Sequence, residues 1–510
     1  MSTDAQALSA ARLLPVRQYI RRGWLLLSRS HADLASAAVD IKVAHAAGTP
    51  WPVYFPLTEV QATLERQLKA SMRPAAWAQI QLRPLQDPVE AVTDHGLLYL
   101  PESYVVPGDR FNEMYGWDSY FIVLGLLRDG DVSRARGMAN NHLYEVTHYG
   151  KVLNANRTYY LTRSQPPFLT ETVRAVYAHT HDRAWLAAAV PALEATHAFW
   201  TSEPHLAAAT GLSRYFDVGT GPAPEVVIGE KDAAGRTHYD RVKSYFRTHP
   251  AAATGYQVAD FYDRASDRLT DLFYKGDRSM RESGFDPTDR FGMFGVDVIH
   301  YAPVCLNSLL FRMETDLAEI ATELGKTEDA GGWRARAELR RAIVDRLLWD
   351  ADAGLYYDYN FQIGQRRPYP FAATFFPLWA GLASPEQARR VWQNLHIFER
   401  PGGVMTSTNV SGSQWDAPFG WAPLQLVAVE GLRRYGYSND ADRLARAWLS
   451  LIVKEFEQHQ TIVEKYDVVR RESELDGSIQ FGYSANQVGF GWTNGVFLEL
   501  LSTRDGLLAH

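Results

Sequence analysis

Apolar residues recur three and four positions apart along most of the chain, which is the spacing of one face of an α-helix. The clearest run lies between Pro303 and Lys326, with apolar positions at Leu306, Leu309, Leu310, Met313, Leu317, Ile320 and Leu324. The same spacing predicts helices from Arg174 to Trp200, Gly332 to Trp349, Pro385 to His396 and Asp440 to Gln460. Strict alternation of apolar and polar residues over six positions is rare, so we expect little β-strand.

Long loops rich in glycine, proline, aspartate and aromatic residues separate these helices. Two examples are Asp350 to Phe371 and Arg400 to Trp421. Loops of this length within a compact protein tend to be functional. No serine- or glycine-rich linker divides the chain. The recurring order of helix, aromatic loop and helix predicts a ring of helix pairs with a cleft at one end.

The first 95 residues are harder to interpret than the rest. They predict an N-terminal helical lead-in from Arg17 to Ala46, followed by an irregular segment, packed on a main domain of residues 96–510. The N-terminus lacks the basic start, apolar stretch and small-residue cleavage site of a signal peptide. Its longest apolar run, Trp24 to Leu27, is too short to span a bilayer. We therefore expect a cytoplasmic protein with no membrane partner.

Composition narrows the possible functions. Lys and Arg number 52 against 59 Asp and Glu, a net charge of −7 without a basic stripe, which argues against a nucleic-acid partner. The one cysteine, Cys305, lies in an apolar helical run and is expected to be a buried thiol, so no disulfide forms within the chain. Aromatic residues reach 12%, with 14 Trp and 26 Tyr, and they suit either a large helical core or the flat faces of sugar rings.

Several common catalytic motifs are absent from the sequence. No G-x-G-x-x-G or phosphate-binding P-loop follows a predicted strand, and no G-x-S-x-G elbow occurs. His179 and His181 are two positions apart, so they fall on different sides of the predicted helix and are poor joint metal ligands. We therefore expect neither a metal nor another cofactor.

Asp, Glu, Arg, Trp and Asn residues concentrate in three segments. They are Val106 to Phe121, Arg281 to Gly292 and Gln414 to Gln425, and shorter runs follow at Val463 to Val468 and Gly489 to Gly495. In glycoside hydrolysis one carboxylic acid protonates the leaving oxygen, while a second carboxylate activates water or attacks the sugar. Carboxylates beside aromatic residues in loops therefore favour a glycoside hydrolase with a small sugar as its substrate.

Two of these segments resemble the signatures of the trehalase family. PGDRFNEMYGWDSY, from Pro107 to Tyr120, is similar to P-G-G-R-F-x-E-x-Y-x-W-D-x-Y and departs from it only at Asp109. QWDAPFGWAP, from Gln414 to Pro423, matches Q-W-D-x-P-x-G-W-x-P throughout. The segments NANRTYYLTRSQPP, RESGFD, VEKYDV and GFGWTNG follow in the expected order, so the resemblance spans roughly residues 100 to 500.

The resemblance implies an all-α fold, an (α/α)6 toroid with long active-site loops, in which residues 96–510 form the catalytic domain. It also implies hydrolysis of α,α-trehalose to two glucose molecules with inversion. By position, Asp286 in RESGFD corresponds to the general acid and Glu464 in VEKYDV to the general base. In such enzymes the two carboxyl groups stand ~6.5–9.5 Å apart, which leaves room for the attacking water. The implied substrate contacts are Arg110, Phe111, Trp117, Asp118, Asn154, Arg163, Glu225 and Trp415.

Each of these residues also has a structural interpretation. The alternatives are a helix cap for Asp286, an ion pair with Lys465 for Glu464, a loop anchor through Arg110 for Asp118, and core packing for Trp117 and Trp415. Glu282, close to Asp286 in sequence, is better explained as the structural partner of an arginine than as a catalyst.

Two departures from the family pattern concern the second sugar. Ala223 stands in GPAPEV where many bacterial members have arginine, although fungal neutral trehalases also lack it. The segment ELDGSIQFGYSANQV lacks the usual glycine run, and Tyr483 replaces a common glutamate. We expect Tyr483 to contact the second sugar. These changes leave one alternative open, a hydrolase of another small α-glucoside such as a glucosylglycerate-type solute. A second alternative is a non-catalytic sugar-sensing or scaffold protein that has kept the fold, and the presence of both Asp286 and Glu464 argues against it.

Overall fold

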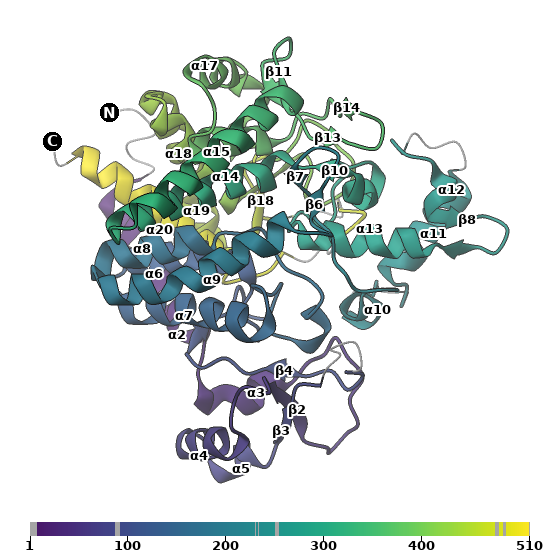
Figure 1. The fold of residues 1–510 in the computed structure, drawn as a ribbon, viewed down its shortest axis with the longest axis vertical. Coiled ribbons are helices and arrows are strands. Elements are labelled where there is room, and N and C mark those ends of the chain that lie inside the picture. Colours follow the sequence, from purple (N-terminus) through teal and green to yellow (C-terminus); the bar gives the residue numbers. More distant parts are fainter. Residues whose placement is uncertain are drawn as a thin grey trace.

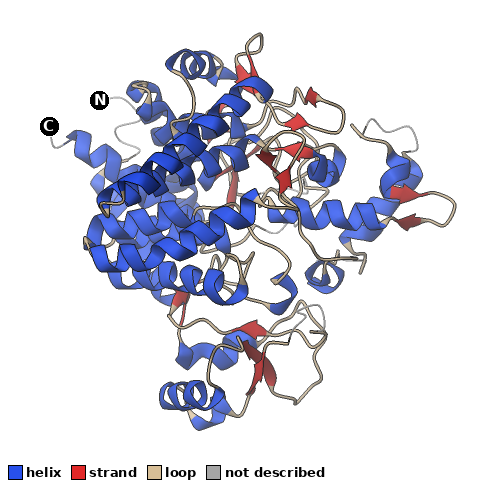
Figure 2. Ribbon diagram, viewed as in Figure 1, coloured by secondary structure: helices blue, strands red, loops and turns tan. Residues whose placement is uncertain are grey.

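Helices dominate the computed structural model of the protein, and its strands form small sheets of two or three strands (Figure 2). The structure describes residues 8–86, 92–229, 231–232, 234–249, 254–474, 479–482 and 486–508. Within these ranges, no helix combines the length and the apolar composition that crossing a membrane would require.

The core of the molecule is a closed ring of helices. In the described part of the chain, six largely buried helices contact one another in sequence order, and the last returns to the first. They are α6 (Gly116–Arg128), α8 (Leu169–Thr180), α14 (Val304–Glu323), α16 (Phe376–Ala380), α18 (Ala422–Arg434) and α20 (Gly491–Leu508). Because each of these helices contacts the next one, and α20 contacts α6, the ring has no open edge.

A second helix precedes each inner helix in the chain and keeps one face in solvent. These outer helices are α2 (Ala10–Leu26), α7 (Val132–Tyr149), α9 (Arg183–Thr201), α15 (Thr327–Leu347), α17 (Pro385–Gln393) and α19 (Ser438–His459). A half-exposed helix outside a buried one produces the double layer of an (α/α)6 toroid. The predicted all-α fold class is therefore confirmed.

One predicted helix is in fact two. The apolar spacing from Arg174 to Trp200 runs through the end of α8 and the start of α9. His181 adopts a left-handed conformation with φ of 51°, and the side chain of Asp182 then caps α9 by accepting a hydrogen bond from the Trp185 amide at 3.0 Å. His181 therefore lies outside the helix that the sequence assigned to it. The spacing concealed this turn because both helices bury apolar faces.

The N-terminal segment departs from the expected long helix and irregular stretch. Its helix α2 ends at Leu26 and packs on α19 and α20 of the ring. A small unit follows, at the bottom of Figure 1, with a parallel sheet in the order β3-β2-β4. The unit comprises α3 (Leu34–Ala38), β2 (Trp51–Phe55), α4 (Gln61–Ser71), α5 (Pro74–Trp77), β3 (Ile80–Pro84) and β4 (Leu97–Leu98). The sequence concealed β2 because a strand that buries consecutive residues does not alternate. The boundary at residue 95 between an N-terminal lead-in and a catalytic domain stays a prediction.

The remaining elements are short helices and strands in the segments that connect the helices of the ring. The helices are α10 (Pro224–Gly229), α11 (His238–Thr248), α12 (Val258–Phe261) and α13 (Asp271–Glu282). Short antiparallel pairs join β1 (Ser28–Arg29) to β5 (Tyr104–Val105), β6 (Leu206–Ala207) to β7 (Leu212–Ser213), β8 (Tyr262–Asp263) to β9 (Arg268–Leu269), β11 (Trp349–Asp350) to β12 (Leu355–Tyr356), β15 (Glu399–Arg400) to β16 (Gly403–Val404) and β17 (Phe419–Trp421) to β18 (Lys465–Asp467). A three-stranded sheet contains β10 (Tyr301–Ala302), β13 (Tyr359–Asn360) and β14 (Gln365–Arg366).

Glycine allows α20 to close the ring against α6. A Cβ atom added at Gly495 would lie 1.9 Å from the carbonyl oxygen of Phe121. One added at Gly125 would lie 2.6 Å from the Cα atom of Gly495 and 2.9 Å from the ring of Trp24. Two helix backbones can approach this closely only where neither carries a side chain.

We predict that Gly495→Ala lowers the free energy of unfolding by about 1–3 kcal/mol, because the methyl group forces the two helices apart. Gly331→Ala is the matched control. It is an exposed glycine of α15 with no atom within 4 Å of an added Cβ. Because alanine is the better helix former, this variant should be more stable by about 0.5–1 kcal/mol. Urea unfolding measures both, and equal shifts in the same direction would contradict the close packing.

Candidate active site

The N-terminal ends of several inner helices face one pocket. Trp117 lies in the first turn of α6, Gln165 shortly before α8, Trp421 directly before α18 and Trp492 in the first turn of α20, and all four line it. The empty space in and above the pocket is about 980 Å³, counted out into the solvent at its open mouth. Because the ring is closed, segments from distant parts of the sequence converge here.

The predicted site residues meet in this pocket. The lining includes Arg110, Phe111, Trp117, Asp118, Asn154, Arg163, Glu225, Asp286, Trp415 and Glu464. The eleventh predicted residue, Tyr483, lies outside the described residues. Their assembly at one place supports the grouping, while the role of each residue stays a prediction.

The two candidate catalytic carboxylates occupy different environments. The side chain of Asp286 is 32% exposed, and its Oδ2 lies 3.7 Å from Nη1 of Arg281. The side chain of Glu464 is only 3% exposed, and its Oε2 lies 2.9 Å from the buried Nζ of Lys465. The ion pair expected from the structural interpretation of Glu464 is therefore present. Asp286, by contrast, follows the end of α13 and begins no described helix.

Asp118 is a third carboxyl group in the pocket. It is buried in the first turn of α6. Loss of water around it, together with the negative charges of Glu464 and Asp286, raises the pKa of Asp118 well above its usual range. The protonated form of a carboxyl group can donate a hydrogen bond, whereas the ionised form can only accept one.

Tryptophan rings form one wall of the pocket. Trp415 stacks on Trp421 with ring centroids 3.8 Å apart, and Trp117 lies tilted at 5.8 Å from Trp415. Trp492 meets the edges of Trp117 and Trp415 at 5.6 and 6.1 Å. Both Trp117 and Trp415 are nearly buried, as the core interpretation expected, yet they also line the pocket. Such faces can pack against the apolar side of a sugar ring.

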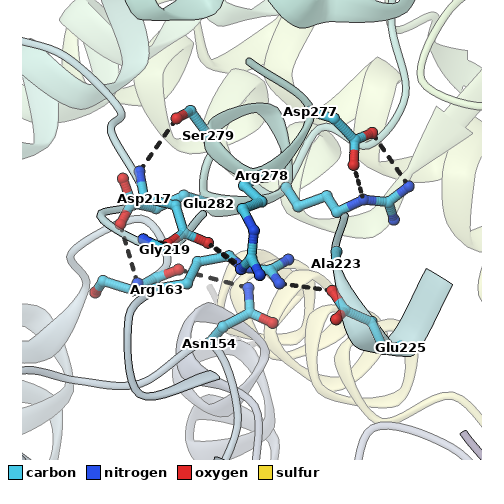
Figure 3. Close-up of polar contacts among 12 residues, drawn as sticks. Asn154, Arg163, Asp217, Gly219, Ala223, Glu225, Asp277, Arg278, Ser279 and Glu282 are labelled. Carbon is cyan, nitrogen blue, oxygen red and sulfur yellow. Dashed lines mark hydrogen bonds and ion pairs between the residues drawn. The ribbon is translucent and has the colours of Figure 1, made fainter. Parts of the chain in front are cut away.

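An arginine network around Arg163 forms a polar part of the pocket lining (Figure 3). Arg163 donates to Oε1 of Glu225 at 2.6 Å and lies 3.2 Å from Oδ2 of Asp217. Burial alone would raise the pKa of Asp217, but Arg163 and Arg278 outweigh it and hold that pKa below its usual value. Among the described residues, the buried Oε2 of Glu225 has no hydrogen-bond partner, so it can accept one from a ligand.

Glu282, beside this network in Figure 3, is a structural anchor. It accepts hydrogen bonds from the amides of Ser164 at 3.0 Å and Phe216 at 2.6 Å, and it lies 3.2 Å from Nε2 of His205. The structural role matches the expectation from the sequence. Its partners here are two amides and a histidine instead of the expected arginine.

A family model described as Trehalase matches residues 39–505. The chain is 39% identical over 435 residues to the cytosolic neutral trehalase of Kluyveromyces lactis, which covers 78% of this chain. It is also 39% identical over 430 residues to that of Saccharomyces cerevisiae, again over 78% of this chain. The chain belongs to the trehalase family.

This trehalase-family chain spans a little more than half the length of those two curated relatives, 55% and 56%. The solved neutral trehalase of S. cerevisiae matches with a TM-score of 0.78 and 33% identity, covering 96% of this chain and 94% of that one. A mannosylglycerate hydrolase of Thermus thermophilus, solved with glucose, matches with a TM-score of 0.52 and 20% identity over 79% of this chain and 96% of that one. The latter likeness shows a shared fold alone.

The departure from many bacterial trehalases at Ala223 leaves no gap in the protein. Ala223 is fully buried in a cluster with Val226 and Tyr239. Arg281 is one of three arginines that line the pocket among the described residues, and its Nε donates to Oδ2 of Asp277 at 3.2 Å. Arg281 begins the RESGFD motif that contains Asp286, so the motif itself held the signal for this pocket residue.

Other pocket residues were also missed. Tyr160 and Trp492 lie within NANRTYYLTRSQPP and GFGWTNG, so the motifs themselves held the signal. Lys42 gave no signal because it belongs to the N-terminal segment. Its Nζ donates to the hydroxyl of Tyr115 at 3.3 Å and lies 3.6 Å from Oε2 of Glu113.

A second perturbed aspartate lies just beyond the candidate acid. Asp289 accepts a hydrogen bond from the Phe294 amide at 3.1 Å. Burial and the nearby charge of Asp416 raise the pKa of Asp289 to about 7, although Arg367 and the Phe294 amide act in the opposite direction. An aspartate in the unfolded chain titrates near pH 4. The folded state therefore keeps this proton longer than the unfolded state does, and Asp289 costs stability as the pH rises from about 4 to about 7.

We predict that Asp289→Asn, which cannot ionise, removes this loss. Relative to the parent protein, the variant should gain about 2 kcal/mol of unfolding free energy between pH 5 and pH 8. Urea unfolding of both proteins at the two pH values measures the gain. Any constant cost of the substitution cancels, because only the change in the difference is compared. A difference that stays the same at both pH values would contradict a raised pKa.

Proposed function

We propose that the protein hydrolyses α,α-trehalose to two glucose molecules with inversion at the attacked carbon. The observation that carries this proposal is the presence of Asp286 and Glu464 in one pocket of a trehalase-family toroid. Inverting hydrolysis needs one carboxylic acid and one carboxylate on opposite sides of the scissile bond. The two curated relatives described above are both named neutral trehalases.

In this mechanism Asp286 is the general acid and Glu464 the general base. Asp286 gives its proton to the oxygen that bridges the two sugars, and the C1–O bond breaks. Glu464 takes a proton from a water molecule, whose oxygen attacks C1 from the opposite face. The attacked ring leaves as β-glucose and the other as α-glucose.

The surroundings of the two carboxylates suit these tasks. Asp286 is partly exposed at the pocket surface, where a leaving sugar can depart. Glu464 is buried, and its contact with Lys465 fixes one carboxylate oxygen. A base held in this way keeps its orientation toward the attacking water, and such positioning contributes strongly to rate.

The other residues of the pocket would hold the substrate. Hydroxyl groups would bond Asn154, Arg163 and Glu225, where the free oxygen of Glu225 is a ready acceptor. Arg110 and Asp118 offer further polar groups, while Phe111, Trp117 and Trp415 offer apolar faces. Tyr483 would contact the second sugar. We expect no metal to take part, because a two-carboxylate mechanism requires none.

Trehalose is favoured over another small α-glucoside. Ala223 and the altered segment before Gly489 raised that alternative, but Arg281 brings a cation to the pocket. The cytosolic names of the curated relatives also favour action in the cytoplasm. Glucose release from trehalose, maltose, kojibiose and glucosylglycerate separates the candidates. The highest kcat/KM should be that of trehalose, and a higher value for glucosylglycerate would overturn this choice of substrate.

We predict that Asp286→Asn and Glu464→Gln each lower kcat on trehalose by about 10²–10⁴-fold, the usual contribution of one positioned acid or base. Each replacement is nearly isosteric, so circular dichroism should change little. Glu464→Gln also removes the charge that pairs with the buried Lys465, so it should lower the thermal midpoint, whereas Asp286→Asn should leave it nearly unchanged. Glu282→Gln is the control for a buried carboxylate nearby, and it should act mainly on stability. If either catalytic variant retained more than about a tenth of parental kcat, the role assigned to that residue would be wrong.

A further inference from the structure

The second signature of the sequence runs alongside the loop that carries the candidate acid. The side-chain amide of Gln414 donates a hydrogen bond to the carbonyl oxygen of Asp286. The backbone amide of Trp415 donates to the carbonyl oxygen of Pro287 at 3.2 Å. Two consecutive residues of the Q-W-D triplet therefore bond to two consecutive residues of the acid loop.

Asp416 continues this series with its carboxylate. Its Oδ1 accepts a hydrogen bond from the hydroxyl of Thr288 at 3.2 Å, and its Oδ2 accepts one from the amide of Asp289 at 2.9 Å. These two residues follow Asp286 by two and three positions. Asp416 is fully buried and is not among the residues that line the pocket, so it acts on the loop and not on a substrate.

Three further donors hold the same carboxylate in place. Hydroxyl groups of Tyr369 and Ser407 each donate to Oδ1 at 2.8 Å, and that of Ser411 donates to Oδ2 at 2.6 Å. Hydrogen bonds to a charged acceptor are roughly twice as strong as neutral ones. Asp416 thus joins the acid loop to two other loops of the rim, and losing it would release all three.

The side chain of Asp286 depends on this support more than a buried residue would. It lies at the pocket surface with 32% of its area exposed, so packing restricts it less than it restricts Glu464. Its direction follows from the backbone of its own loop, and a displacement of about 1 Å at a reacting group can cost about 10²-fold in rate.

We propose that Asp416 is a positioning residue that fixes the direction of the general acid by holding the backbone of residues 288 and 289. This role rests on the proposed function, because it presupposes that Asp286 protonates the leaving oxygen. It also gives a physical reason for the Q-W-D triplet: Trp415 lines the pocket, while its two neighbours clamp the acid loop.

The test compares two substrates that differ in their need for an acid. Trehalose needs a proton on its leaving oxygen, whereas α-D-glucosyl fluoride loses fluoride, which departs with the bonding electron pair and needs no protonation. Asp416→Asn keeps the shape of the side chain but replaces one acceptor oxygen with an amide. It should lower kcat on trehalose about 10–100-fold, and kcat on the fluoride by less than about threefold.

Two reference variants define the expected patterns. Asp286→Asn should show the same selective loss on trehalose, because it removes the acid itself. Glu464→Gln should lose activity on both substrates, because both need an activated water. If Asp286→Asn were not selective, the acid assignment in the proposed function would fail, and the role of Asp416 would fall with it. If Asp286→Asn lost activity on trehalose alone while Asp416→Asn lost activity on both substrates, the positioning role of Asp416 would be overturned and the acid assignment would stand.

A matched control separates positioning from loss of stability. Glu314 is an equally buried carboxylate on α14, bonded to Arg340 at 2.7 Å and to His197 at 3.0 Å, and it does not line the active-site pocket. Glu314→Gln should leave the ratio of the two activities unchanged, whatever it does to the thermal midpoint. If Asp416→Asn lowered both activities equally, or neither, the positioning role would be refuted.

A second variant keeps the test decisive if Asp416→Asn does not fold. Thr288→Val removes the hydroxyl that bonds to Oδ1 of Asp416 and retains the carboxylate with its other four donors. It should show the same selective loss on trehalose at a smaller size, about 3–10-fold. An unchanged ratio of the two activities in a folded Thr288→Val protein would also refute the proposal.

Discussion

The architecture depends on the close contact between the first and the last inner helix. Gly125 of α6 and Gly495 of α20 have no side chains, and a Cβ atom at either would overlap the backbone of the other helix. This contact joins two glycines that are 370 positions apart in the chain. Trp117 and Asp118 begin the first helix and Trp492 begins the last, so the pocket exists only when the ring is closed. A ring without a free edge is also a rigid support for long loops.

The loops at the pocket carry buried charged side chains, and burying such a charge lowers the stability of the fold unless it is paired. Buried carboxylates and guanidiniums are tolerated only when they are paired and hydrogen-bonded. Arg163 satisfies this condition through Glu225 and Asp217, and Lys465 through Glu464. One oxygen of Glu225 is left for a ligand among the described residues. The same arrangement therefore stabilises the fold and keeps hydrogen-bonding groups ready at the pocket.

The sequence predicted the ring and the grouping of the site for different reasons. Helices such as α14 and α19 carry one apolar face, and this spacing can be read without knowing their neighbours. The site depended on the resemblance of several short motifs to the family pattern, RESGFD and VEKYDV among them, and such motifs name residues but not their geometry. The parallel strand β2 was missed because it buries consecutive residues, and the turn at His181 because an apolar face continues on both sides of it. Lys42 could not have been found, because only folding brings the N-terminal segment to the pocket.

The central claim is that two carboxylates in this pocket perform an inverting hydrolysis, and the anomeric form of the first product tests it directly. Proton NMR during the first turnovers, before mutarotation, distinguishes α- from β-glucose. If water enters opposite the leaving oxygen, trehalose gives equal amounts of β-glucose from the attacked ring and α-glucose from the other. Initial formation of α-glucose alone would mean retention through a covalent intermediate, and it would contradict the roles assigned to Asp286 and Glu464.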